Sequence, residues 1–308
     1  MIKTAITGGG TPDGGELIRL LAMHPDVDLT AIHARGLEGT KVCDRHHGLI
    51  GETNLSFVSE IDTSKCDVLF VCSDELSVAQ IERLRLERPE LKLILFRIPD
   101  GLDAKRNGIV YGLPEVNRKL LVRGATAAVV AESFATMALV SLFPFAQNLL
   151  LNGDIRISVT APESIIDKTD LDGVKSEIMN MLPEIQSSFN GDVIIEARKG
   201  DTRRSALMDI EFASSLTLQQ MLDLYDVYDD HNFTFATTQP IGVSEVAGTD
   251  KCVISISRTP GGEANLRVAA DCRLRGASGD AVHIMNLMFG LHEKTGLSLK
   301  ASDFEPIS

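Results

Sequence analysis

The stretch KTAITGGGTPDGGELIRLLAMHP, residues 3–25, contains an apolar strand, a cluster of glycines and an amphipathic helix in direct succession. The glycines are spaced as Gly8-x-Gly10-x-x-x-Gly14. Glycines at such a turn let phosphates approach the backbone, and the N-terminus of the following helix offers unpaired N–H groups. The succession therefore indicates a dinucleotide-binding turn after the first strand of a parallel sheet.

Strand and helix patterns alternate through the first part of the chain. Short apolar runs lie at residues 3–7, 28–32, 66–72, 91–96 and 125–131, with a helical spacing over 78–87 among them. This alternation predicts a parallel α/β sheet with right-handed crossovers. After about Leu151 the strands become longer and alternate in polarity, at 154–161, 192–198, 206–214 and 252–258, and helices are predicted at 216–226 and 280–292. The fold class is therefore α/β, a Rossmann-like parallel-sheet domain followed by a mixed α+β, sheet-rich domain.

Composition excludes several classes of function. The 308 residues carry a net charge of −13, with no run of basic residues, which disfavours nucleic acid as a partner. No export signal is found at the N-terminus, and the apolar run 133–151 is interpreted as a buried helix, so we expect a cytoplasmic protein without a membrane partner. Five cysteines without a CxxC pair are expected to be reduced thiols, and no metal site is predicted.

The cofactor prediction rests on the glycine-rich turn and on Arg35, which follows the second predicted strand and can hold an adenosine 2′-phosphate, favouring NADP. Thr11 as N-cap and Pro12 as first residue form a helix start that needs no ligand, and Asp13 complements the helix dipole. Two interpretations stay open: the turn binds NADP, or it has kept its shape and no longer binds the phosphates of a dinucleotide. The candidate cofactor-binding residues are Gly8, Gly10, Thr11, Gly14, Arg35 and Ser73.

Four segments resemble one enzyme family. GELIRLLAMHPDVDLT (15–30), YGLPEVNRK (111–119), PEI (183–185) and RGASGDAVHIMNLMFGLHEKTGL (275–297) are similar to segments of the N-acetyl-γ-glutamyl-phosphate reductases of arginine biosynthesis, within the semialdehyde dehydrogenase group. The resemblance implies an NADP-binding Rossmann domain, 1–132 and 276–308, closed by a returning C-terminal helix, and a substrate and oligomerisation domain, 133–275. It also implies that a cysteine thiolate attacks an acyl phosphate and that a hydride reduces the thioacyl enzyme.

The departures from the family pattern fall on its chemical positions. In VAESFAT (130–136) Ser133 occupies the position of the nucleophilic cysteine, and Met179 and Met181 replace a pair of histidines. Asp74-Glu75-Leu76 replaces a PHG turn after the third strand, and the substrate loop is shortened at 161–170. A serine hydroxyl needs a positioned base, and the matching segments offer no histidine. We therefore interpret Ser133 as the N-cap of a helix that ends before Pro144.

These losses predict a divergent family member that lacks the family reaction, a pseudoenzyme. The alternative is an active NADP-dependent reductase of an acyl phosphate or semialdehyde that uses altered residues. We expect a small-molecule ligand, and a homo-oligomer or a hetero-oligomer with an active paralogue. Asp280 and His283 are assigned to a half-buried helix face without a catalytic role, and Cys272 is interpreted as a buried thiol.

Overall fold

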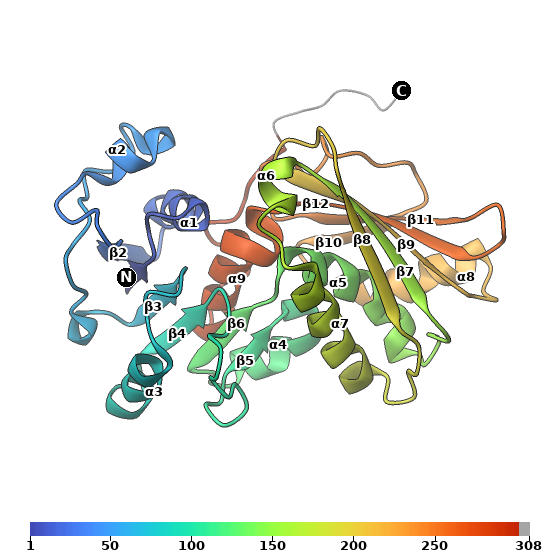
Figure 1. The fold of residues 1–308 in the computed structure, drawn as a ribbon, viewed down its shortest axis with the longest axis horizontal. Coiled ribbons are helices and arrows are strands. Elements are labelled where there is room, and N and C mark those ends of the chain that lie inside the picture. Colours follow the sequence, from blue (N-terminus) through green and yellow to red (C-terminus); the bar gives the residue numbers. More distant parts are fainter. Residues whose placement is uncertain (302–308) are drawn as a thin grey trace. The chain divides into compact units, whose positions relative to one another are not determined.

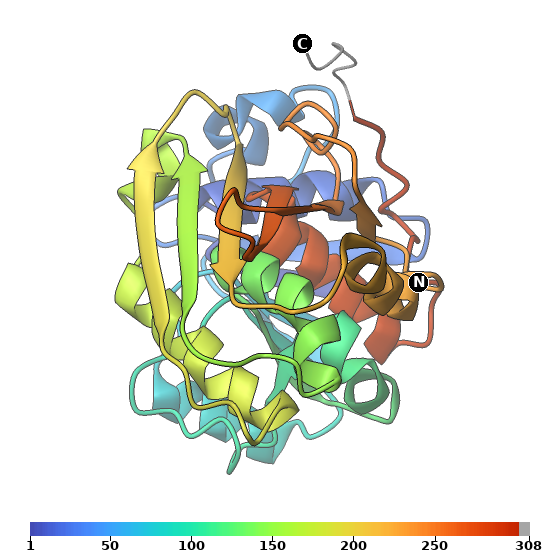
Figure 2. The ribbon, with the colours of Figure 1, turned by 90° about the vertical axis from the view of Figure 1, so that its right-hand side faces the viewer.

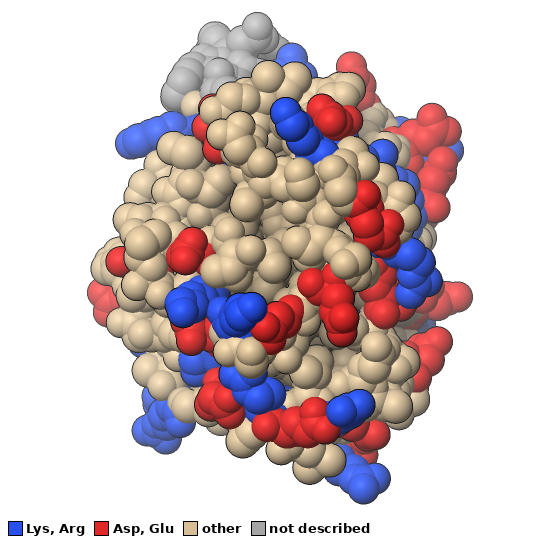
Figure 3. Space-filling view, turned by 90° about the vertical axis from the view of Figure 1, so that its left-hand side faces the viewer, with Lys and Arg blue, Asp and Glu red and all other residues tan. Residues whose placement is uncertain are grey.

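The computed structural model describes residues 1–301, and the chain folds into two compact units. The first unit contains Met1–Ala131 and Ala277–Ser298, and the second contains Glu132–Gly276 and the last described residues, 299–301. Among the described residues, no helix has both the length and the apolar character that crossing a bilayer requires. On the face drawn in Figure 3, acidic and basic side chains are intermixed around an uncharged area, so the excess of acid is not gathered into one patch there.

The first unit is built on a six-stranded parallel sheet (Figure 1). Its strand order is β2-β1-β3-β4-β6-β5. The strands are β1 (Ile2–Thr7), β2 (Val27–His33), β3 (Val68–Val71), β4 (Lys92–Leu95), β5 (Val110–Gly112) and β6 (Ala127–Val130). The helices are α1 (Pro12–Ala22), α2 (Val42–Arg45), α3 (Val78–Glu87), α4 (Pro114–Val122) and α9 (Gly279–Met288). The predicted α/β class is thus confirmed for this unit, whereas β5, α2 and α4 were not predicted.

The strand order creates a switch point between β1 and β3. The chain leaves β1 towards β2 on one side, and β3 continues towards β4 on the other side. Right-handed crossovers then place α1 and α3 on opposite faces of the sheet. Ile81 of α3 packs in one buried cluster with Ala5, Leu69 and Leu93. Open α/β sheets bind ligands beside such a switch point, at the carboxyl ends of the strands.

The returning helix α9 contacts α1 and α4, and all of its residues are buried. Asp280 and His283 are 0% and 2% exposed, so the prediction of a half-buried face was wrong. The reason is that α9 packs against elements of the first unit that precede it by more than 150 residues in the sequence. A local pattern does not indicate such contacts. A π-helical segment, Leu274–Ser278, precedes this helix.

The second unit is built on a six-stranded mixed sheet of order β10-β11-β12-β9-β7-β8. The strands are β7 (Ile155–Ala161), β8 (Val193–Lys199), β9 (Ser205–Phe212), β10 (Thr234–Thr237), β11 (Cys252–Arg258) and β12 (Ala264–Asp271). The helices are α5 (Ser133–Gln147), α6 (Glu163–Ile166), α7 (Leu171–Ile185) and α8 (Leu218–Asp223), which is followed by a 3-10 segment, Leu224–Tyr228. Figure 2 shows β7 (yellow-green) and β8 (yellow) running in the same direction. The mixed sheet was predicted, but β10, β12, α6 and α7 were not.

Helix α5 packs against α7, β9 and β12 and does not end before Pro144 as predicted. It continues to Gln147 because other groups satisfy the carbonyl that a proline leaves without an N–H donor. Tyr228 donates its hydroxyl to the Val140 carbonyl at 2.7 Å, four residues before the proline. Tyr225 donates to the next carbonyl, that of Ser141, at 2.6 Å. These two buried hydroxyls stabilise a helix end that the sequence pattern alone would stop earlier.

Candidate functional site

The glycine-rich turn joins β1 to α1 in the first unit. Thr11 is the N-cap of α1 and its hydroxyl accepts a hydrogen bond from the Gly14 N–H at 3.0 Å, with Pro12 as the next residue. This confirms the predicted helix start. Gly8 has a φ of +76°, and a side chain on Gly14 would overlap the Gly8 carbonyl. Both glycines are therefore required by the tight turn itself, whether or not a phosphate binds there.

The carboxylate of Glu75, from the loop after β3, contacts this turn, and no sequence pattern indicates this contact. Its carboxylate Oε2 accepts hydrogen bonds from the Thr7 hydroxyl at 2.9 Å and from the Gly8 N–H at 3.1 Å, and lies 2.9 Å from His33 Nδ1. Oε1 accepts from the Arg35 N–H at 3.1 Å. The loop after β3 therefore places one carboxylate against the ends of β1 and β2.

Glu75 is ionised at neutral pH. Burial acts to raise the pKa of its carboxyl, but the hydrogen bonds from the Arg35 N–H, the Thr7 hydroxyl and the Gly8 N–H, together with the nearby His33, outweigh burial and lower it below its usual value. The side chain is 16% exposed. A fixed negative charge thus lies within hydrogen-bond distance of the amides that an anionic ligand would use.

Several other polar groups of the turn also have partners within the first unit. The Gly9 N–H donates to the His33 carbonyl at 2.9 Å, and the Thr11 N–H donates to the Gly8 carbonyl at 3.1 Å. Arg45 Nε donates to the Gly10 carbonyl at 2.9 Å, and His46 Nε2 lies 2.7 Å from the Gly9 carbonyl oxygen. Hydrogen bonds from the neighbouring segments, together with bonds inside the turn, therefore hold its backbone in place.

The six predicted cofactor-binding residues are gathered around this turn, but they do not present an open phosphate site. A side chain on Gly8 would overlap Ser73, whose buried hydroxyl has no hydrogen-bond partner among the described residues. Arg35 is exposed, and its N–H is bound to Glu75. The turn fits a dinucleotide phosphate poorly, because Glu75 already accepts from the Gly8 N–H of the turn and from the Arg35 N–H after β2.

Ser133, which the sequence resemblance places at the position of the family's nucleophile, lies in the second unit, at the start of α5. The N-cap of this helix is Glu132 and not Ser133, so the predicted cap was wrong by one residue. Glu132 Oε2 accepts from the N–H groups of Phe134 at 2.6 Å and Ala135 at 3.1 Å. Ser133 is the first residue of the helix, 6% exposed, and its hydroxyl donates to the Arg275 carbonyl. The hydroxyl proton of Ser133 is thus already bound by a backbone acceptor.

Two acidic side chains meet beside Ser133. The Glu132 N–H donates to Glu177 Oε1, from α7, at 3.0 Å. Burial raises the pKa of the Glu132 carboxyl to about 7, and the charge of Glu177 adds to this effect, although the N–H groups at the helix start oppose it. A carboxyl with such a pKa exchanges its proton near neutrality, and in its ionised form it brings negative charge beside Ser133.

Cys272 lies beside Ser133, and the two side chains share a hydrogen bond. Burial raises the pKa of the Cys272 thiol far above its usual value, and that hydrogen bond offsets the effect only in part. The side chain is 7% exposed. The thiol is therefore protonated at neutral pH and is no substitute nucleophile in this state. Met179 and Met181, which the sequence resemblance places at the family's histidine positions, lie on α7 and are partly exposed.

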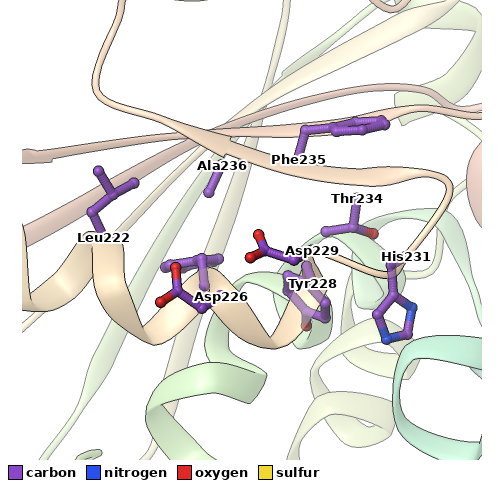
Figure 4. Close-up of a pocket in the computed structure, with 9 residues that line it drawn as sticks. Leu222, Asp226, Tyr228, Asp229, His231, Thr234, Phe235 and Ala236 are labelled. Atoms are coloured by element: carbon purple, nitrogen blue, oxygen red, sulfur yellow. The ribbon is translucent and has the colours of Figure 1, made fainter.

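A cavity of about 280 Å³ lies elsewhere in the second unit, between the 3-10 segment and β10 (Figure 4). Two carboxylates, of Asp226 and Asp229, and the ring of His231 lie among its walls. Its lining is completed by Leu222, Tyr225, Tyr228, Thr234, Phe235 and Ala236. None of the predicted site residues lines this cavity.

Known proteins are similar to this chain both over its first domain and over its whole length. Residues 3–123 match the family described as semialdehyde dehydrogenase, NAD binding domain. The N-acetyl-γ-glutamyl-phosphate reductase of Phocaeicola vulgatus is 33% identical over 331 residues, covering 99% of this chain and 100% of that protein. The corresponding reductase of Parabacteroides distasonis is 32% identical, with the same coverage of both chains.

Solved structures share the two-unit fold. Aspartate semialdehyde dehydrogenase II of Vibrio cholerae aligns with a TM-score of 0.70 and 16% identity over 94% of this chain and 99% of that one. The aspartate semialdehyde dehydrogenase of Candida albicans, solved with NADP, aligns with a TM-score of 0.68 and 13% identity over 94% and 98%. These structures support the fold, and the full-length sequence similarity shows that the chain belongs to the N-acetyl-γ-glutamyl-phosphate reductase family.

Proposed function

We propose that this chain is a member of the reductase family that does not reduce an acyl phosphate. The observation that carries the proposal is the state of Ser133, which stands where the family has its nucleophilic cysteine and donates its hydroxyl to the Arg275 carbonyl. A hydroxyl nucleophile needs a base that removes its proton. The neighbouring carboxylate of Glu132 instead accepts from the first N–H groups of α5.

The negative charge at this position supports the same proposal. An acyl phosphate is anionic, and its attack creates a further oxyanion that must be stabilised by donors. Glu132 and Glu177 place two carboxyl groups beside Ser133, and the N–H groups of Phe134 and Ala135 are already used by Glu132. The groups that would stabilise the oxyanion are thereby occupied by the chain itself.

For the cofactor, we propose that NADP binding is weak at best. Pro12 has no N–H to offer, and Asp13 places a carboxylate in the first turn of α1, where phosphate charge would arrive. Arg35 remains as an exposed cation that could hold a 2′-phosphate. An Asp13→Thr variant, compared with the native chain in an NADPH titration, is expected to bind more tightly.

We also propose that the second unit mediates association, as a homo-oligomer or with an active paralogue. The two edge strands of its sheet, β8 and β10, carry the exposed apolar side chains Ile194 and Phe235. Open strand edges with apolar side chains favour pairing with another chain. Light scattering on the purified chain, alone and mixed with a paralogue, tests this proposal, and a monomer in both samples would contradict it.

The alternative function is an active NADP-dependent reductase of an acyl phosphate or a semialdehyde, favoured by the match to an NAD-binding domain over residues 3–123. The deciding assay measures NADP reduction with N-acetylglutamate semialdehyde and phosphate, with the Phocaeicola vulgatus reductase as positive control. We expect no NADPH above background from this chain. Turnover of about 1 s⁻¹ or more, the low end of ordinary enzymes, would favour the alternative.

A further inference from the structure

The carboxylate of Glu75 occupies the switch point of the first unit's sheet. Its donors come from two neighbouring strand ends: Thr7 and Gly8 at the end of β1, and His33 and Arg35 at the end of β2. Glu75 itself follows β3, the strand on the other side of β1. The loop after the third strand thus reaches across the end of the first strand to the second.

These donors belong to the two places that a dinucleotide uses in such a sheet. The turn after the first strand holds the pyrophosphate, and the end of the second strand holds the adenosine ribose or its 2′-phosphate. The Gly8 N–H and the Arg35 N–H, one from each place, both donate to Glu75 at 3.1 Å. A cofactor that used these two amides would have to displace the carboxylate.

We propose that Glu75 is an internal ligand of the first unit: its carboxylate takes the place of the cofactor's anionic group and excludes NADP. The carboxylate supplies what a bound anion would supply, namely negative charge and acceptors for convergent donors, so the turn keeps its shape without a nucleotide. Arg45 and His46, which hold the Gly10 and Gly9 carbonyls, fasten the same turn from outside. The inference rests on the cofactor part of the proposed function and is independent of the chemistry at Ser133.

Removing the carboxylate should convert the internal site into an open anion site. In a Glu75→Ala variant, the Thr7 hydroxyl, the two N–H groups and His33 remain as convergent donors around a space the size of a carboxylate. Each charge-assisted hydrogen bond gained by a ligand phosphate corresponds to roughly a tenfold to hundredfold gain in affinity. We therefore expect the variant to bind NADPH at least tenfold more tightly than the native chain.

Asp74 offers a matched control from the same loop. Its side chain is 63% exposed and pairs with Arg97 at 3.1 Å. An Asp74→Asn variant removes one negative charge next to Glu75 in sequence, without opening the donors. Native chain, Asp74→Asn, Glu75→Ala and Glu75→Gln are titrated with NADPH and with 2′-phospho-AMP by calorimetry. Only the Glu75 variants should gain affinity, with the larger gain in Glu75→Ala, because glutamine still fills the space.

A second measurement keeps the test decisive if Glu75→Ala loses stability. Formate and inorganic phosphate are added during thermal unfolding, and either anion should raise the melting temperature of Glu75→Ala by more than that of Asp74→Asn. If Glu75→Ala does not fold even with these anions, NADPH binding to the isosteric Glu75→Gln decides. Micromolar binding of NADPH or NAD by the native chain, weakened in the Glu75 variants, would overturn the proposal and make Glu75 a ligand of the cofactor's ribose. Equal, weak binding by all four proteins would overturn it too.

The binding readout separates this inference from the lost reaction. A gain of NADPH affinity in Glu75→Ala without any turnover supports both proposals. Turnover by the native chain would refute the proposed loss of acyl-phosphate reduction and, since that reaction uses NADPH, the exclusion of the cofactor as well. An unchanged affinity in Glu75→Ala, with no turnover by the native chain, would refute only the role of Glu75.

Discussion

Replacing Glu132 by glutamine is expected to stabilise the protein above neutral pH. The carboxyl of Glu132 has a pKa of about 7 against a usual value of 4.5, because it is buried and lies near Glu177. Ionising it is therefore harder in the folded protein than in the unfolded chain. Glutamine keeps an oxygen that can accept from the N–H groups of Phe134 and Ala135, so the helix cap survives while the charge is removed.

The size of the effect follows from the difference in pKa. A carboxyl whose pKa is raised in the folded state lowers the free energy of unfolding as the pH rises from 4.5 towards 7, and the loss stays constant above that range. Each tenfold difference in proton affinity corresponds to about 1.4 kcal/mol. The free energy of unfolding of Glu132→Gln should therefore exceed that of the native chain by about 1 kcal/mol at pH 5.5 and by about 3 kcal/mol at pH 8.5. Because part of the side chain is in contact with solvent, both figures are upper bounds.

Urea unfolding of the native chain and the variant at pH 5.5 and 8.5 measures the two gains. Glu177→Gln should yield part of the gain at pH 8.5, and the double variant should gain less than the sum, because each change removes the same repulsion. A Glu132→Gln variant that is less stable than the native chain at pH 8.5 would refute the reasoning. Attraction between the carboxylate and the start of α5 would then outweigh burial and repulsion.

Ser133→Cys alone is expected to leave the family reaction absent in the NADP reduction assay, because Glu132 would disfavour the thiolate and no imidazole assists; family-like turnover would show that the site is intact. Tyr228→Phe leaves the Val140 carbonyl of α5 without its hydroxyl donor and should cost about 1–3 kcal/mol in urea unfolding; no change would mean that water or a shifted backbone replaces that donor. Glu75 has a pKa below 4.5 in the folded protein, so its contribution is present above pH 4.5 and is lost as the pH falls through the folded value. Glu75→Gln should therefore be less stable than the native chain at pH 7 by a margin that shrinks on acidification, and a margin independent of pH would contradict the assignment of charge.

Elements governed by neighbours in the chain could be predicted from the sequence. The start of α1 with Thr11 as cap was correct, because side chain and N–H groups lie three residues apart. The limits of α3, Val78–Glu87, also agree with the predicted helix, whose start is a capping box of Ser77 and Gln80. The parallel sheet of the first unit follows from the same kind of short-range alternation.

Groups that meet through the fold could not be predicted in this way. Glu75 reaches the Gly8 N–H across 67 residues, and the contact exists only because β3 lies beside β1 in the sheet. Glu132 and not Ser133 caps α5, and the Ser133 hydroxyl instead donates to the carbonyl of Arg275, 142 residues later in the chain. A local pattern records which hydrogen bonds a side chain is able to make, whereas the tertiary packing determines which partner is present to accept them.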